Sequence, residues 1–82
     1  MNRYNELKLR VLSLFASDRQ WLEPGEAARR LDFRPARAAW TYFGRLWSFG
    51  LLERRSSGRG TLQYRISDIG IARLRWLRSR RG

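Results

Sequence analysis

The apolar residues of this sequence change their spacing at Gly50, from a helical period to strict alternation. Before Gly50 they recur at the spacing of one face of an α-helix. After it, Leu62, Tyr64 and Ile66 alternate with polar residues, beyond a flexible stretch at 56–60 that suits the tip of a β-hairpin. A chain that carries both patterns is predicted to adopt an α+β fold.

Local start and stop signals predict two helices in the first part of the chain. The first is expected over residues 3–16, with Asn2 as its cap. A short extended piece at Trp21 and Leu22 follows it. The second helix is expected over residues 24–31, because proline suits the first helical position and carboxylates suit the first turn.

The second half of the chain is divided in the same way. Pro35 is expected to begin a third helix over residues 35–49, and Gly50 suits the left-handed cap that ends it. Ser67 is expected to cap a last helix whose apolar stripe is Ile69, Ala72, Trp76 and Leu77. The hairpin is predicted over residues 51–66 and the last helix over residues 68–80.

Composition removes most enzyme chemistry. The sequence has no cysteine and no histidine, which excludes thiolate or imidazole metal sites, cysteine nucleophiles and Ser-His-Asp triads. Its seven carboxylates are scattered, and several suit helix starts, so an acid–base pair has little support. We therefore expect no catalytic site, no metal and no cofactor.

The balance of charge predicts a polyanionic partner. The chain has 18 basic and 7 acidic residues, for a formal net charge of +11. Such a charge on a small body produces a strong positive field. The sequence shows neither a signal peptide nor a stretch long enough to span a membrane, so we expect a cytoplasmic protein associated with the nucleoid.

The two sides of the third helix differ in chemistry. One arc is apolar, and the opposite arc carries arginines, small residues and hydroxyls without any carboxylate. Such an arc supplies forked donors for guanine, short residues for close approach and hydroxyls for phosphates. The arc expected in the core is Ala36, Ala39, Trp40, Phe43, Leu46 and Trp47, and the exposed arc is Arg34, Arg37, Ala38, Thr41, Arg45 and Ser48.

Three stretches carry a family resemblance: residues 23–31 (EPGEAARRL), 49–55 (FGLLERR) and 64–70 (YRISDIG). They resemble the second-helix opening, the exit from the third helix and the entry into the final helix of winged helix-turn-helix domains of the MarR and PadR groups of bacterial transcriptional regulators. The resemblance implies one domain over residues 1–82, with a three-helix core, a C-terminal two-stranded hairpin wing and a final fourth helix. It also implies that the third helix lies in the major groove of double-stranded DNA, with the wing beside the neighbouring minor groove or backbone.

These inferences predict a DNA-binding transcriptional regulator without its own effector domain. Affinity would come from phosphate contacts, and bases would be read by Arg37, Thr41 and Arg45 with their neighbours. The hairpin residues expected to contact DNA are Arg54, Arg55, Arg59 and Arg65. Two other functions stay open: an RNA-binding winged helix, and a protein-interaction module that binds an acidic partner.

Some of these residues can also be explained without DNA binding. The helix arginines could form a solvated face, and Arg54, Arg55 and Arg65 could protect the edge of the hairpin from pairing with another chain. Trp40, Phe43 and Trp47 are expected to pack in the core rather than to stack on bases. Tyr4, Leu9, Leu12 and Trp76 offer more apolar surface than a small core needs, which suggests a homodimer through the first and last helices.

Overall fold

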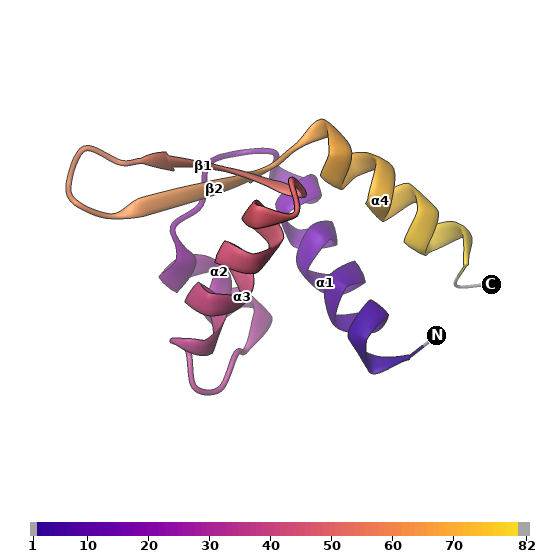
Figure 1. Cartoon of the computed structure of the whole chain (residues 1–82). Helices are drawn as coiled ribbons and strands as arrows, with labels where there is room; N and C mark the ends of the chain where they lie inside the picture. Colours follow the sequence, from indigo (N-terminus) through magenta and orange to yellow (C-terminus); the bar gives the residue numbers. More distant parts are fainter. Residues whose placement is uncertain (1, 81–82) are drawn as a thin grey trace.

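The computed structural model describes residues 2–80, without the side chain of Asp18. Residue 1 and residues 81–82, the ends of the domain expected over residues 1–82, lie outside the described residues. Within them the chain is an α+β fold of four helices and one antiparallel hairpin, a layout compatible with that of a winged-helix domain (Figure 1). The elements are α1 (Arg3–Asp18), α2 (Pro24–Leu31), α3 (Ala38–Ser48), β1 (Leu52–Ser56), β2 (Leu62–Ile66) and α4 (Asp68–Ser79).

The hairpin projects to one side of the body, and the start of α1 and the end of α4 lie on the opposite side (Figure 1). The core is built around Phe43 of α3. Its ring lies 5.4 Å from that of Phe15 in α1 and 5.9 Å from that of Tyr64 in β2, both nearly edge to face. All the residues that are fully buried in this core are apolar. Every helix contributes to this cluster, and α3 does so through Ala39, Phe43 and Leu46.

The sequence predicted a short extended piece between α1 and α2, and in the structure this piece pairs with the hairpin. The amide of Leu22 donates to the carbonyl of Tyr64, and the amide of Tyr64 donates back, each over 2.8 Å. This antiparallel bridge lies beside β2, whose other edge pairs with β1 in the register Leu52 to Ile66. The base of the hairpin is therefore fixed from both sides.

The predicted caps are present at two helices. The side chain of Asn2 accepts a hydrogen bond from the Asn5 amide, and that of Ser67 accepts one from the Gly70 amide, each over 2.9 Å. The bounds of α2 coincide with the range predicted from its proline and carboxylates, although Glu23 makes no side-chain cap bond. Helix starts in this chain are therefore largely encoded by local sequence.

The third helix begins three residues later than expected, at Ala38. Pro35 lies in a tight turn that follows a cis Arg34–Pro35 peptide. The carbonyl of Pro35 accepts from the amide of Ala38 across only three residues, and the next two carbonyls are used in the same way. The helix ends at Ser48, one residue before the predicted end. Gly50 has the predicted left-handed conformation, with a φ of 79°, and the Leu51 amide donates to the Leu46 carbonyl.

The fourth helix buries a side that includes only Leu77 of the expected stripe. Gly70, Leu74 and Leu77 face the core, whereas Ile69, Ala72 and Trp76 are exposed. The cause lies at Gly70, where a β-carbon would clash with the carbonyl oxygen of Leu51. This close approach turns the glycine side of α4 inward and leaves the neighbouring apolar side outside.

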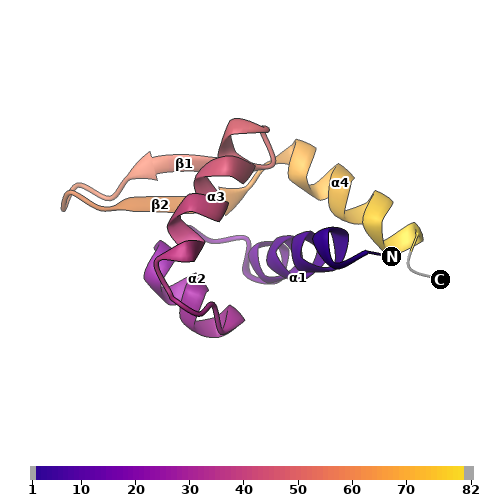
Figure 2. The ribbon, with the colours of Figure 1, turned by 60° about the horizontal axis from the view of Figure 1, so that its bottom comes forward.

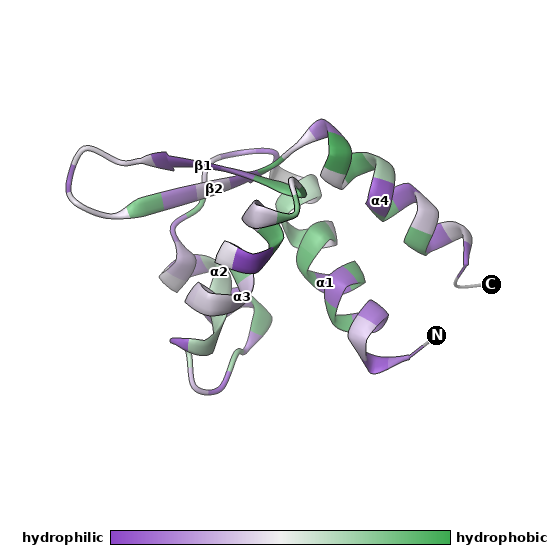
Figure 3. Ribbon diagram, viewed as in Figure 1, coloured by the Kyte–Doolittle hydropathy of each residue, from purple (hydrophilic) through white to green (hydrophobic). Residues whose placement is uncertain are grey.

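The apolar residues suggested for a homodimer divide into two groups. Leu9 and Leu12 belong to the core, while Tyr4 and Trp76 are exposed. The homodimer stays a prediction, and the residues open to it are fewer than the sequence suggested. Figure 3 shows hydrophilic residues along most of the hairpin and hydrophobic residues on α1 and at the start of α4. Within the described part of the chain, no helix has the length and apolar character that crossing a membrane requires.

Candidate nucleic-acid interface

The outer side of α3 is open to solvent. Ala39, Phe43 and Leu46 are buried, and the side chains on the opposite arc are exposed. In Figure 2, α3 crosses in front of the hairpin and no other helix or strand passes over it. The exposed residues within the helix include the predicted ones, Ala38, Thr41, Arg45 and Ser48.

The residues of this side form a shallow surface. Ala38, Thr41 and Arg45 border a hollow that is completed by Phe33 and Tyr42. The Ser48 hydroxyl donates a hydrogen bond to the Arg45 carbonyl over 2.7 Å, so this side chain lies close to the helix backbone. The exposed side of α3 therefore combines a long cation with short side chains, as close approach to a large ligand requires.

The two remaining predicted residues of the recognition segment precede the helix. Arg37 occupies the position before the first helical residue and is exposed. Arg34 lies further back in the turn, where its guanidinium pairs with the exposed carboxylate of Asp32 over 3.1 Å. Arg37 thus extends the side that Arg45 occupies, whereas Arg34 is already paired with a carboxylate.

The expectation that Trp40 and Trp47 belong to the core is wrong. They are 46% and 40% exposed, and Ala36 of the same expected arc is exposed as well. The buried arc is narrower than expected, since α3 contacts the core mainly through Ala39, Phe43 and Leu46. Trp40 lies over Gly25 at the start of α2, and Trp47 faces the hairpin, so each covers a junction between elements.

The hairpin presents its arginines on two different faces. Neighbouring residues of a strand point to opposite sides, so Arg54 and Arg55 cannot share a face. Arg54 pairs in register with the buried Tyr64 and lies on the face of the hairpin that packs against α3. Its guanidinium carbon lies 3.5 Å from the centre of the Trp47 ring. Arg54 therefore continues the exposed side of α3 onto the hairpin.

Arg55 and Arg65 occupy the other face, together with Trp21. Their guanidinium carbons lie 4.3 and 4.5 Å from the centre of the Trp21 ring. Arg55 also donates to the Gln63 side-chain oxygen over 3.0 Å, and Arg65 pairs with Glu53 over 2.9 Å. These contacts place both residues away from the face that carries Arg54, so the structure separates them from the exposed side of α3.

The tip of the hairpin is ordered by its own hydrogen bonds. The Ser57 amide donates to the Thr61 carbonyl over 2.8 Å, and the two hydroxyls are 2.6 Å apart. Gly58 and Gly60 have positive φ angles of 86° and 81°, which only glycine adopts without strain. Arg59 lies exposed between them and enters none of the ion pairs that the described residues form.

The exposed side of α3 carries no carboxylate. Between Asp32 and Glu53 the chain has no acidic residue. On α2, Glu26 accepts hydrogen bonds from Arg29 over 2.7 Å and from Arg30 over 3.0 Å. The bonds from Arg29, and then those from Arg30, lower the pKa of the Glu26 carboxyl below its usual value. Both arginines of α2 thus pair with a carboxylate of their own helix, whereas Arg45 of α3 has no carboxylate in its helix.

The structure therefore assembles a continuous cationic surface from part of the predicted set. It consists of Arg37, Ala38, Thr41, Arg45, Ser48, Trp47 and Arg54, and we call it the α3 surface. Trp47 is the member that the sequence placed elsewhere. Strand alternation in the sequence could have separated Arg54 from Arg55, but the stacking partner of each depends on tertiary packing.

Comparison with known proteins identifies no relative of this chain. No family model, curated protein or solved structure matches this chain. Its function is therefore inferred from the residues and their geometry.

Proposed function

We propose that this protein is a winged-helix protein that binds double-stranded DNA and regulates transcription. In this proposal α3 enters the major groove, and the hairpin lies along the neighbouring minor groove or backbone. A major groove about 12 Å wide accommodates an α-helix with short side chains on its approaching side. Ala38, Thr41 and Ser48 are the short residues, and Arg37 and Arg45 are the forked donors at the two ends.

One observation carries the proposal: the exposed side of α3 is free of covering elements and has no carboxylate. A helix face that is only solvated ordinarily carries both signs of charge. In this fold the described carboxylates that pair with arginine, namely Glu26, Asp32 and Glu53, do so on other elements. The cations of the α3 surface are thus left for an external anion.

The residues of the surface divide into two roles. The first role is contact with base edges, where a bidentate arginine contact discriminates guanine. It would be taken by the exposed residues Arg37, Thr41 and Arg45. Arg54 and Arg59 lie on the hairpin and would contact phosphates or the minor groove, which sets the position without reading sequence. Trp47 is not a contact residue in this proposal, because its ring supports Arg54.

A duplex selected from a random library tests this function. We expect selection to enrich one motif, and binding of that motif to weaken steeply with salt. With about six phosphates neutralised, the logarithm of the binding constant falls with a slope of about −5 against the logarithm of the salt concentration. A nearly flat salt dependence, or no enriched motif, contradicts the proposal.

Competition separates the alternatives that the sequence left open. The major groove of duplex RNA is deep and narrow and cannot admit α3, so duplex RNA should not displace the selected DNA. Displacement by RNA at equal strength would favour an RNA-binding function. Unchanged DNA affinity after loss of Arg37 and Arg45 would favour a protein partner for the α3 surface.

A further inference from the structure

The fourth helix has a second apolar side that the core does not use. Ile69 is 61% and Trp76 46% exposed, and Ala72 lies between them on the same side of the helix. The core contact of α4 is made instead by Gly70, Leu74 and Leu77. Apolar side chains gathered on one exposed face indicate a binding surface, whereas isolated ones do not.

This side continues onto two other elements. One hollow is lined by Ile69, Ala72, Arg73 and Trp76, and a second adjoins it because both share Ile69 and Arg73. The second hollow also includes Phe49, which is 61% exposed after the end of α3, and Lys8 of α1. We call the whole the α4 surface, formed by Lys8, Phe49, Ile69, Ala72, Arg73, Trp76 and Arg80.

The charges of the α4 surface have one sign. Arg73 and Arg80 lie over the Trp76 ring, with guanidinium carbons 5.9 and 4.8 Å from its centre, and Lys8 lies at the other end. The nearby carboxylates face elsewhere. Asp68 borders a separate hollow with Arg19 and Arg65, and Glu6 lines the groove between α1 and α2.

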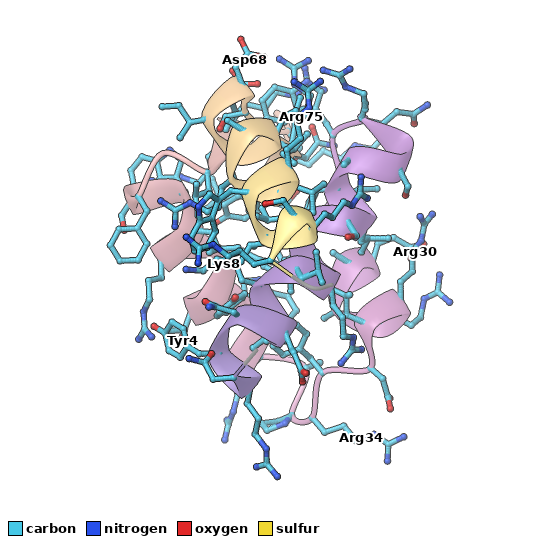
Figure 4. All side chains as sticks on the ribbon, turned by 90° about the vertical axis from the view of Figure 1, so that its right-hand side faces the viewer. Tyr4, Lys8, Arg30, Arg34, Asp68 and Arg75 are labelled. Atoms are coloured by element: carbon cyan, nitrogen blue, oxygen red, sulfur yellow. The ribbon has the colours of Figure 1, made fainter. Side chains whose placement is uncertain are left out.

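Figure 4 shows this arrangement from the side of α4. Asp68 points outward at the far end of the helix, while Tyr4 and Lys8 lie together on one side of α1. Arg75 extends from the other side of α4, away from Lys8. The α4 surface is therefore an apolar strip with a cationic border.

The border decides between possible occupants. A second copy of this chain would bring its own Lys8, Arg73 and Arg80 against the same residues, and like charges at an interface oppose association. Two hollows separated by Ile69 suit projecting apolar side chains better than a flat lipid surface. We propose that the α4 surface binds a segment of another protein that combines apolar anchors with aspartate or glutamate residues. The anchors occupy the two hollows, and the carboxylates pair with the three cations.

Selection from a random peptide library, with the full chain as bait, tests this proposal. We expect the enriched peptides to carry two apolar residues at helical spacing and an excess of Asp and Glu. Their affinity is expected to fall about thirtyfold or more in Ile69→Gln and in Trp76→Gln, as for loss of an interface anchor. Leu62→Gln is the matched control, because it removes an exposed apolar residue of the hairpin and leaves the net charge unchanged.

A second pair of variants tests the charged border. Arg73→Gln should weaken the same peptides, and Arg75→Gln, which removes the same charge from the other side of α4, should leave them bound. Equal losses in the two would mean that the peptides respond only to net charge and would overturn the proposal. So would three other outcomes: no acidic enrichment, dimerisation in sedimentation that Trp76→Gln abolishes, or binding of anionic vesicles that the same variant removes.

Discussion

The guanidinium of Arg54 in β1 stacks on the ring of Trp47 in α3, at 3.5 Å from the ring centre. This contact joins the hairpin to the helix at a point outside the buried core. A cation held on an aromatic face is stabilised by electrostatic attraction to the ring, and its side chain loses conformational freedom. The stack therefore fixes the direction of Arg54 relative to the exposed side of α3 before any ligand binds.

A double-mutant cycle with Arg54→Gln and Trp47→Leu measures this coupling. The two single variants and the double variant are expected to show an interaction free energy of about 0.5–1 kcal/mol, the range for an exposed cation–π pair. Urea unfolding followed by circular dichroism provides the stabilities. Additive effects of the two substitutions would show that the stack does not hold the hairpin against α3.

Arg37→Ala and Arg45→Ala should each weaken binding of the selected duplex by about 1–3 kcal/mol, the value of one bidentate base contact. The loss should be confined to one base position in each case, because these residues lie at opposite ends of the α3 surface. Fluorescence anisotropy with single-base variants of the duplex measures it. Arg75→Ala and Arg78→Ala, which remove the same charge from α4, serve as controls and should cost less and equally for all sequences.

Arg59→Ala should act differently from these helix variants. Arg59 lies exposed at the hairpin tip and would contact phosphate or the minor groove, so its loss should reduce the slope of the salt dependence by about 1 for every duplex tested. The hydrogen bonds of the tip involve Ser57 and Thr61 side chains, so the free energy of unfolding should stay the same. A loss that differs strongly between sequences would instead assign Arg59 to base readout.

Local signals explain the part of the fold that was predicted from sequence. Caps at Asn2 and Ser67, the opening of α2 and the left-handed Gly50 depend on residues next to one another, so the order of elements could be read directly. The start of α3 could not, because Pro35 is compatible both with a first helical turn and with the tight turn that it adopts.

The sides of the helices depend on packing between distant residues. A helical wheel places Trp47 beside the buried arc, but only the position of the hairpin puts Arg54 over its ring. It places Ile69 and Trp76 on an apolar stripe, but the approach of Gly70 to Leu51 turns that stripe outward. The exposed arc of α3 could therefore be predicted from the sequence. The full sets of residues that form the α3 and α4 surfaces could be assigned only from the structure.

Gly70→Ala should destabilise the fold by about 3 kcal/mol, the upper range for an overpacked site. An added β-carbon would collide with the Leu51 carbonyl oxygen and with the Ile66 side chain, and the backbone group cannot move aside. Gly25→Ala is the matched control in another helix, since its β-carbon would meet only Trp40 at 3.8 Å. That variant should be more stable by up to about 1 kcal/mol, and a stable Gly70→Ala protein would refute the close contact of α4 with Leu51.

We expect the folded protein to lose stability in alkaline solution because of Tyr42. Its hydroxyl is buried without a hydrogen-bond partner among the described residues, and burial raises its pKa from 10.0 to about 12, with Tyr4 adding and Arg45 opposing. The unfolded chain therefore loses this proton more readily than the folded one. The contribution of Tyr42 is complete below pH 10 and is lost as the pH rises towards 12. Thermal unfolding across this interval should show a steeper decline for the wild type than for Tyr42→Phe.

The phenylalanine variant also separates two explanations of that decline. At pH 7 it should be as stable as the wild type or more stable, because it removes a buried hydroxyl that has no partner. If the decline above pH 10 came from the other tyrosines or from loss of arginine contacts, the two proteins would lose stability in parallel. Parallel curves would mean that Tyr42 ionises as easily in the folded chain as in the unfolded one, and its hydroxyl would then have to reach solvent beside Thr41 and Arg45 on the α3 surface.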